Sequence, residues 1–365
     1  MRIAQVAPLY ESVPPKLYGG TERVVSWLTE ELVRLGHDVT LFASGDSLTT
    51  ARLVPACQKA LRLDPNCVDQ LAHHVIMMDQ VFSAKEDFDI IHFHIDYLHF
   101  PFSRRQQIAN VTTLHGRLDL PDLEFVYRRF RDMPVISISN AQRDPLPWAN
   151  WQGTVYHGLP RDAFSPGSGK GGYLAFLGRT SPEKGLDQAI AIAKRAEIPL
   201  KIAAKIDRVD VEYFETIIKP LLDHPLIEFV GEIGYPEKNA FLGNAAGLLF
   251  PVNWREPFGL VMIEAMACGT PVVAYPMGSV PEVMREGVTG FIVPDADEAV
   301  RAVKKLGEIK RAKCRRYFEQ HFDAGRMAKD YLTIYERLVR QKSSPANDPD
   351  GVFSWTNIAS PNSIT

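Results

Sequence analysis

The stretch that decides the fold class is IAQVAPLYESVPPKLYGGTERVVSWLTEELVRLGHDVTLFA, residues 3–43. Ile3–Pro8 is a short apolar run typical of a buried strand. A helix is predicted over Thr21–Leu35, because apolar residues recur there along one helical face. Gly36 ends that helix, and Val39–Ala43 predicts the next strand. These segments predict a β-α-β unit, since two parallel strands need a crossover helix between them.

Strand and helix signals go on alternating, and the pattern restarts after the middle of the chain. In the first half, the further strands predicted are Ile90–His94, Val111–Leu114 and Val135–Ile138. The second half opens with a strand at Tyr173–Leu177, a turn at Gly178-Arg179 and a helix at Leu186–Ala196. Its further strands are Leu200–Ala204, Ile227–Val230, Leu248–Val252, Pro271–Ala274 and Phe291–Val293. This alternation is typical of parallel sheets with helices on both faces.

The chain has 365 residues, about twice what one hydrophobic core usually organises, which predicts two domains. We expect two doubly wound, Rossmann-like α/β domains that face each other across a cleft. The first would span residues 1–165 and the second residues 172–325, joined by a linker at 166–171. A final helix at 326–341 could cross back to the first domain, and the polar segment 342–365 is expected to be a mobile tail.

The composition argues against several classes of protein. Lys and Arg number 41 against 44 Asp and Glu, a formal net charge of −3, so the chain lacks the basic excess of a nucleic-acid binder. No apolar run approaches the roughly 18–20 residues that span a bilayer. The four cysteines form no CxxC pair, which favours reduced thiols and a cytoplasmic location.

The segment Glu256-Pro-Phe-Gly-Leu-Val-Met-Ile-Glu264 follows a predicted strand and carries the most informative spacing. Its Pro and Gly predict a turn, after which a helix can begin. The amides of residues 258–260 then lie at the start of that helix, where unpaired N–H groups can bind an anion. Glu256 and Glu264 flank this turn, and carboxylates are strong acceptors for sugar hydroxyls. The alternative is an ordinary helix start, in which one Glu complements the helix dipole at the N-terminus and the other is simply exposed to solvent.

A second loop, Gly178-Arg-Thr-Ser-Pro-Glu-Lys-Gly185, again lies between a strand and a helix. Arg179 offers a planar fork for phosphate oxygens and Lys184 adds a movable charge, so both can reach one diphosphate. A capped helix start with solvated Arg and Lys is the alternative. The loop Gly19-Gly20-Thr21-Glu22 is a third candidate, because glycines allow close backbone approach and a helix begins there. A plain turn explains it equally well.

Other motifs carry less information about function. Gly167–Gly172 fits G-x-G-x-x-G but precedes a strand, so it is not a dinucleotide fingerprint. Asp87-Phe-Asp89 spells a metal-binding D-x-D, yet it introduces a strand and is interpreted as a turn. His92 and His94 would project from one side of a strand, but no Cys or Glu cluster completes a zinc site, so no metal is expected. His115 follows the end of a strand, where functional groups gather, and is the histidine expected to act.

Four of these features belong together: Gly19-Gly20, His115, Arg179 with Lys184, and Glu256-x7-Glu264. In combination they resemble the retaining glycosyltransferases of family 4, which have the GT-B fold. The resemblance covers about residues 1–340, and the Glu-x7-Glu segment is its most specific part. It implies that the first domain holds an acceptor and the second a nucleotide-diphosphate sugar.

The resemblance also implies a role for each site residue. The diphosphate would be bound by Gly20, Arg179, Lys184, Phe258, Gly259 and Leu260. The nucleoside would contact Glu264, Glu232, Ile233 and Lys238. The catalytic residues beside the transferred sugar would be Glu256 and His115. Contact with the acceptor or the sugar would come from Gly19, Thr21 and Lys205.

Two segments depart from the family pattern. After a strand expected at Val155-Tyr156, the chain has His157-Gly158 where many members have Asn-Gly. After the strand Leu200–Ala204, the usual Gly-x-Gly is replaced by Ala204-Lys205-Ile206-Asp207. Both departures could alter the preference for sugar or acceptor, and Lys205 adds a charge near the donor.

The implied reaction is retaining transfer of a hexose from a nucleotide sugar to an acceptor hydroxyl, without cofactor or metal. UDP-glucose is the favoured donor and GDP-mannose the next, and the acceptor could be a polysaccharide, a lipid-linked sugar or a small molecule. Basic, aromatic segments at Phe100–Arg105 and Tyr127–Arg131 would allow peripheral membrane contact, although a solvated face is favoured. The alternatives are a nucleotide-sugar epimerase on the same fold, a glycoside hydrolase using Glu256 and Glu264, and a non-catalytic binding module.

Overall fold

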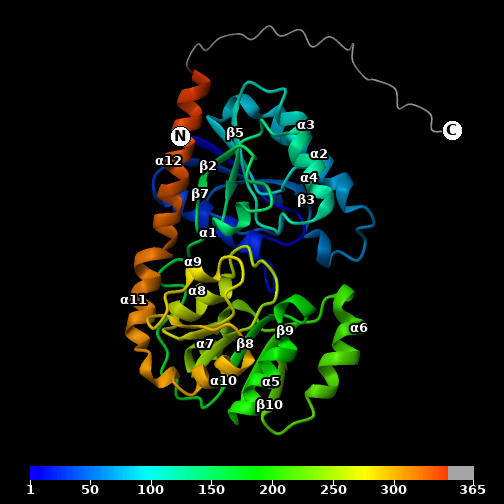
Figure 1. The fold of residues 1–365 in the computed structure, drawn as a ribbon. Coiled ribbons are helices and arrows are strands. Elements are labelled where there is room, and N and C mark those ends of the chain that lie inside the picture. The colour runs from blue at the N-terminus through cyan, green and yellow to red at the C-terminus, as the bar shows by residue number, and fades with distance from the viewer. Residues whose placement is uncertain (344–365) are drawn as a thin grey trace, which may run out of the picture.

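Two parallel sheets, one in each half of the chain, organise the molecule (Figure 1). The computed structural model describes residues 1–343. The first sheet contains β1 (Arg2–Val6), β2 (Asp38–Ser44), β3 (Arg52–Cys57), β4 (Ile90–Phe93), β5 (Ala109–Thr113), β6 (Val135–Ser137) and β7 (Trp151–Thr154). The second contains β8 (Leu174–Arg179), β9 (Leu200–Lys205), β10 (Ile227–Gly231), β11 (Gly247–Phe250), β12 (Val272–Ala274) and β13 (Gly290–Ile292). We call the two sheets with their helices the first and the second lobe.

Both sheets have the same doubly wound order. The strands run β3-β2-β1-β4-β5-β6-β7 in the first lobe and β10-β9-β8-β11-β12-β13 in the second, and all the pairings are parallel. The order reverses next to β1 and next to β8, which are the points where such sheets bind ligands at their carboxyl ends. The expected fold of two Rossmann-like domains is confirmed.

Helices follow most strands. In the first lobe they are α1 (Gly20–Arg34), α2 (Gln70–Ser83), α3 (Phe100–Ser103) and α4 (Pro121–Arg129). In the second lobe they are α5 (Leu186–Ala196), α6 (Val211–Tyr213), α7 (Tyr235–Asn244), α8 (Leu260–Ala267), α9 (Val280–Val283), α10 (Ala296–Val303) and α11 (Arg311–His321). Central strands such as β4 and β11 are buried along their whole length, since helices cover both faces. No helix within residues 1–343 is long and apolar enough to cross a bilayer.

Some predicted boundaries were wrong. Gly178 and Arg179, predicted as a turn, are the last residues of β8 and pair with Ala204 and Lys205 of β9. The strand expected at Val155-Tyr156 ends earlier, at Thr154. β3 was not predicted at all. It is an edge strand with mixed burial and a central Pro, so it lacks a continuous apolar run.

The last helix, α12 (Ala324–Ser343), belongs to the first lobe in space although it follows the second in sequence. It packs on α1 and β5, and it runs along the first lobe while α11 lies against the second (Figure 1). Tyr331 and Tyr335 are its fully buried side chains nearest the sheet. The tail expected at 342–365 lies, from residue 344 onward, outside the described residues.

The segment predicted as a linker is attached to the second lobe. The amides of Gly167, Gly169 and Gly171 donate to the carbonyls of Cys268, Gly243 and Asn244 at 2.9–3.0 Å. The chain therefore reaches β8 along a fixed path.

Candidate active site

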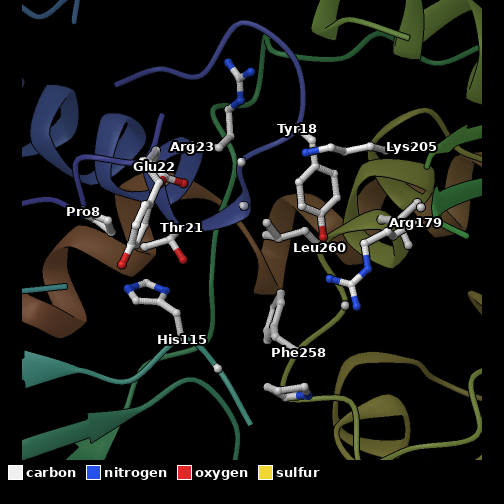
Figure 2. A pocket seen from close by; sticks show the side chains of 18 of the residues that line it. Pro8, Tyr18, Thr21, Glu22, Arg23, His115, Arg179, Lys205, Phe258 and Leu260 are labelled. Carbon is white, nitrogen blue, oxygen red and sulfur yellow. The ribbon is translucent and has the colours of Figure 1, made fainter. Parts of the chain in front are cut away.

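A cavity of about 970 Å³ lies between the lobes. Every residue to which the resemblance gave a role lines it. They are Gly19, Gly20, Thr21, His115, Arg179, Lys184, Lys205, Glu232, Ile233, Lys238, Glu256, Phe258, Gly259, Leu260 and Glu264. Figure 2 shows His115, Thr21 and Glu22 on one side of this cavity, with Arg179 and Lys205 on the other. Within residues 1–343 no group of three or more His, Cys, Asp or Glu is placed to hold a metal ion.

The start of α8 follows the turn that the sequence predicted. Gly259 precedes the helix with φ 77°, a left-handed conformation that favours glycine, and a Cβ there would lie only 3.0 Å from Cζ of Phe250. No side chain caps this helix. Among the described residues, no protein group accepts a hydrogen bond from the amides of residues 258–260. These amides and the helix dipole therefore remain free for an anionic ligand.

Lys184 and Glu256 form an ion pair in the wall of the cavity. Nζ of Lys184 lies 2.6 Å from Oε2 of Glu256, and Nε1 of Trp254 donates to the same oxygen at 3.0 Å. The Lys184 ammonium also lies 4.7 Å from the centre of the Trp254 ring. The buried Glu256 carboxylate is thus held in one orientation by a cation and an indole N–H.

Arg179 is held by two carboxylates. Its Nη2 lies 2.8 Å from Oε1 of Glu183, and its Nε lies 3.0 Å from Oδ2 of Asp210. Desolvation raises the pKa of Asp210, against the opposing effect of Arg179. Lys205 pairs more loosely with Asp207, at 3.6 Å, and lies over the ring of Tyr18. The cations on this side are therefore positioned before any ligand binds.

A second ion pair in the cavity wall joins Lys238 and Glu264. Nζ of Lys238 lies 2.9 Å from Oε1 and 3.2 Å from Oε2 of Glu264, which is buried on α8. Beside it, the guanidinium of Arg23 lies 4.5 Å above the ring of Tyr235. Arg23 belongs to α1, so the first lobe reaches this end of the cavity as well. The sequence had not indicated Arg23.

The histidines of the first lobe are linked through buried hydrogen bonds. Gln5 Nε2 donates to Oη of Tyr335, so its Oε1 must accept from Nε2 of His94, at 2.8 Å. Nδ1 of His94 then accepts from Nε2 of His115, at 2.9 Å. Burial lowers the pKa of His94 well below its usual value and that of His115 to about 3, so both rings are neutral at pH 7.

This chain of bonds assigns the tautomer of His115. With its proton on Nε2, the ring keeps a lone pair on Nδ1, which is buried and has no partner among the described residues. His115 lines the cavity with its ring half-buried, and Nδ1 is the one ring nitrogen left without a partner among the described residues. The chain continues beyond Tyr335, whose hydroxyl bonds to Nδ1 of His92 at 2.5 Å, while Nε2 of His92 bonds to Thr113.

His157, the departure from the family pattern, lies between the lobes. Its ring stacks on His115 with centroids 5.4 Å apart, and it meets Phe258 edge-on at 4.7 Å. Burial lowers the pKa of His157 well below its usual value. The substitution therefore supplies a neutral ring that connects the histidine of the first lobe to the anion-binding turn of the second.

Asp96 and Trp254 also line the cavity and, like Arg23, were not among the residues predicted from the sequence. Asp96 follows β4 at its carboxyl end, two residues after His94, so the rule that selected His115 would also have found it. Asp96 is accessible within the cavity, yet the surrounding walls desolvate it and raise its pKa to about 6. Trp254 lies in the loop between β11 and α8 and carried no signal beyond its residue type.

Comparison with known proteins agrees with this geometry. Residues 161–321 match the family model for glycosyl transferases group 1, and residues 18–146 match the model for Glycosyltransferase Family 4. A D-inositol 3-phosphate glycosyltransferase of Salinispora tropica is 30% identical over 200 residues, 49% of this chain and 41% of that protein. An uncharacterized 41.2 kDa protein from the cps region of Klebsiella pneumoniae is 30% identical over 45% of this chain and 46% of its own length. The matches thus span less than half of these curated relatives.

Solved structures resemble the whole chain. AviGT4, a glycosyltransferase involved in avilamycin A biosynthesis, superimposes with a TM-score of 0.72 at 24% identity, covering 93% of this chain and 98% of that one. Sucrose-phosphate synthase from Thermosynechococcus elongatus gives 0.78 at 19% identity over 93% and 100%. Anabaena HepE in complex with UDP and glucose gives 0.71 at 17% identity over 92% and 100%. At these identities the likeness shows the fold, and together with the two family models it establishes that the chain belongs to the family 4, group 1 glycosyltransferases of the GT-B fold.

Proposed function

We propose that this chain transfers a hexose from a nucleotide-diphosphate sugar to an acceptor hydroxyl, with retention of anomeric configuration. The observation that carries the proposal is the meeting of Arg179, Lys184 and the amides of residues 258–260 in one cavity. A guanidinium, an ammonium and free helix amides form a site for a diphosphate, and they can stabilise the charge that develops on it as it leaves.

The other residues of the cavity have places in this reaction. Glu264 would accept hydrogen bonds from the ribose hydroxyls, with Lys238 holding its carboxylate. Nδ1 of His115 would accept from a hydroxyl of the transferred sugar. Glu256, fixed by Lys184 and Trp254, would lie beside the sugar as oxocarbenium character develops. An acceptor hydroxyl would attack on the face that the diphosphate leaves and pass its proton to a phosphate oxygen.

We further propose that this step needs neither a cofactor nor a metal, since Arg179 and Lys184 provide cationic stabilisation that a metal otherwise supplies. UDP-glucose is the proposed donor, with GDP-mannose next, and the solved HepE structures that share the fold hold UDP with glucose or UDP-glucose. We propose a cytoplasmic location, where nucleotide sugars are available. Peripheral contact with the inner face of the membrane is compatible with this location.

Product analysis tests the proposal. The purified chain is first screened for thermal stabilisation by UDP-, GDP- and ADP-sugars, because a ligand that binds only the folded state raises its stability. It is then incubated with the stabilising donor and a set of sugar acceptors, and the products are identified by NMR. A new glycoside with the donor's anomeric configuration is expected. An isomerised nucleotide sugar would instead indicate the epimerase, and an inverted glycoside would overturn the retaining mechanism.

A further inference from the structure

The cavity wall opposite the residues proposed to bind the donor differs from the donor side in its charged groups. It is formed by the first lobe and includes Tyr10, Glu22, Arg62, Asp96 and Tyr97. The rings of Tyr10 and Tyr97 are about 40% exposed, so their apolar faces are open to a ligand. If the second lobe holds the donor, this wall holds the acceptor, and its chemistry selects which acceptors bind.

The cation on this wall is already neutralised. Nη1 of Arg62 lies 3.1 Å from Oε1 of Glu11, and the guanidinium lies 5.9 Å from the centre of the Tyr10 ring. The histidines there carry no charge at pH 7, since burial lowers the pKa of His74, His94 and His115. Arg23, the other first-lobe cation that lines the cavity, lies over the ring of Tyr235 and interacts with Glu264. Among the described residues no cation acts on the Asp96 carboxyl, since desolvation alone raises its pKa.

Its carboxylates, in contrast, have no cation paired with them. Asp96 has no hydrogen bond or ion pair with any described residue, and Glu22 has no salt bridge there. The buried Glu22 carboxyl accepts backbone hydrogen bonds only. The Asp96 carboxylate is thus a hydrogen-bond acceptor with no donor among the described residues, and an O–H group of a ligand can supply one.

We propose that the first-lobe wall binds an uncharged, hydroxyl-rich acceptor, an unphosphorylated sugar or polyol unit, and that Asp96 accepts a hydrogen bond from it. This inference rests on the proposed transferase function and deepens it. A phosphorylated acceptor, such as the inositol 3-phosphate named in the curated relatives, would place its anion beside Asp96, on which no cation of the described residues acts. Lys205, on the opposite wall, is already near Asp207.

The test compares acceptors that differ only by a phosphate. The full chain and its stabilising donor are incubated with glucose or glucose 6-phosphate, mannose or mannose 6-phosphate, and myo-inositol or inositol 3-phosphate. Donor hydrolysis without acceptor is measured alongside. The uncharged member of at least one pair should be glycosylated at least about tenfold faster than its phosphate, as one uncompensated like-charge contact predicts. Methyl and octyl glucoside distinguish a free sugar from one carried on a lipid, and activity with either supports the proposal.

A substitution locates the effect. Asp96→Asn should raise KM for the uncharged acceptor at least about threefold, and it should narrow the discrimination against the phosphorylated one. Thermal stabilisation by the donor should persist, which shows that the variant is folded. Asp223→Asn, at an exposed site outside the cavity, is the matched control and should leave both acceptors unaffected.

The outcomes separate this inference from the proposed function. Faster transfer to the phosphorylated members, equal rates within every pair, or donor hydrolysis with no transfer at all would each overturn the neutral-acceptor proposal while a donor-consuming enzyme remained. Absence of both transfer and donor hydrolysis with every nucleotide sugar would overturn the proposed function itself, and this inference with it.

Discussion

The ammonium of Lys184 and the carboxylate of Glu256 are 2.6 Å apart in the wall of the cavity, although they lie 72 positions apart in sequence. The cation that we propose for binding the diphosphate is therefore paired, in the free protein, with the acid proposed to flank the sugar. Removing either partner leaves the other charge uncompensated in a partly buried place.

Glu256→Gln should therefore lower kcat for transfer by about 10²–10³, the range found when one preorganised electrostatic group is removed from an active site. Initial rates of glycoside formation at saturating donor measure this. The control is Glu228→Gln, which breaks a Lys–Glu contact of 2.9 Å on the exposed edge strand, with Lys201. Equal activity of Glu256→Gln and Glu228→Gln would remove Glu256 from the catalytic set.

Arg179→Ala should weaken binding of the nucleotide diphosphate at least tenfold, about 1.4 kcal/mol, since it deletes a guanidinium that Glu183 and Asp210 hold in position. Calorimetric titration with UDP and GDP measures the affinity. Arg195→Ala, which removes a surface pair with Asp297, serves as control. An unchanged dissociation constant for Arg179→Ala would show that the diphosphate binds elsewhere.

Glu282 on α9 connects the lobes. Its carboxylate accepts from the amides of Asn140 and Ala141 at 2.7 Å and from Oη of Tyr156 at 2.8 Å. Hydrogen bonds to a charged group contribute about 1.5–3 kcal/mol, so Glu282→Ala should favour a more open arrangement. Small-angle scattering should then show a larger radius of gyration. Glu286 is the control, because its carboxylate accepts from the amide of Ile292 within the second lobe. Glu286→Ala should leave the radius of gyration unchanged.

Tyr335→Phe should disturb His115 from the last helix. It leaves Nε2 of Gln5 and Nδ1 of His92 without their buried partner, which should cost about 1–3 kcal/mol of unfolding free energy. Because Gln5 then loses the bond that orients its amide, the Nε2–H tautomer of His115 should no longer be fixed. Denaturant unfolding gives the stability, and ¹⁵N chemical shifts of the imidazoles give the tautomer. Tyr317→Phe is the control. An unchanged His115 tautomer in Tyr335→Phe would refute the assignment of that tautomer through the chain of hydrogen bonds.

Glu22 makes stability depend on pH. Desolvation raises its pKa from 4.5 to about 7, so the folded state holds a proton that the unfolded state releases. The resulting stabilisation of the protonated form is complete below pH 4.5 and is lost as the pH rises toward 7, about 3 kcal/mol in all. Glu22→Gln should therefore be more stable than the wild type at pH 8 and lose that advantage by pH 5. Urea unfolding across this range measures it, and a pH-independent difference would contradict the assignment.

Local sequence predicted most of the secondary structure because its signals are local. A buried parallel strand needs a short apolar run, and the helix that follows needs a 3.6-residue stripe. The predicted helix Leu186–Ala196 is confirmed to the residue. β3 was not predicted because an edge strand need not be apolar. The motif at 256–264 was predicted for the same local reason, since Gly259 alone permits the turn that opens α8.

By itself, then, the sequence determined the two doubly wound sheets, the order of their elements and the residues at the carboxyl ends of the strands. Only the tertiary structure decided which of these residues meet across long separations, as Lys184 meets Glu256, Glu282 meets Asn140, and Tyr335 meets His92. Hydrogen bonds and ion pairs act over about 3 Å, so they depend on how the lobes and α12 dock. That docking is set by packing of the whole chain and leaves no periodic trace in any one segment.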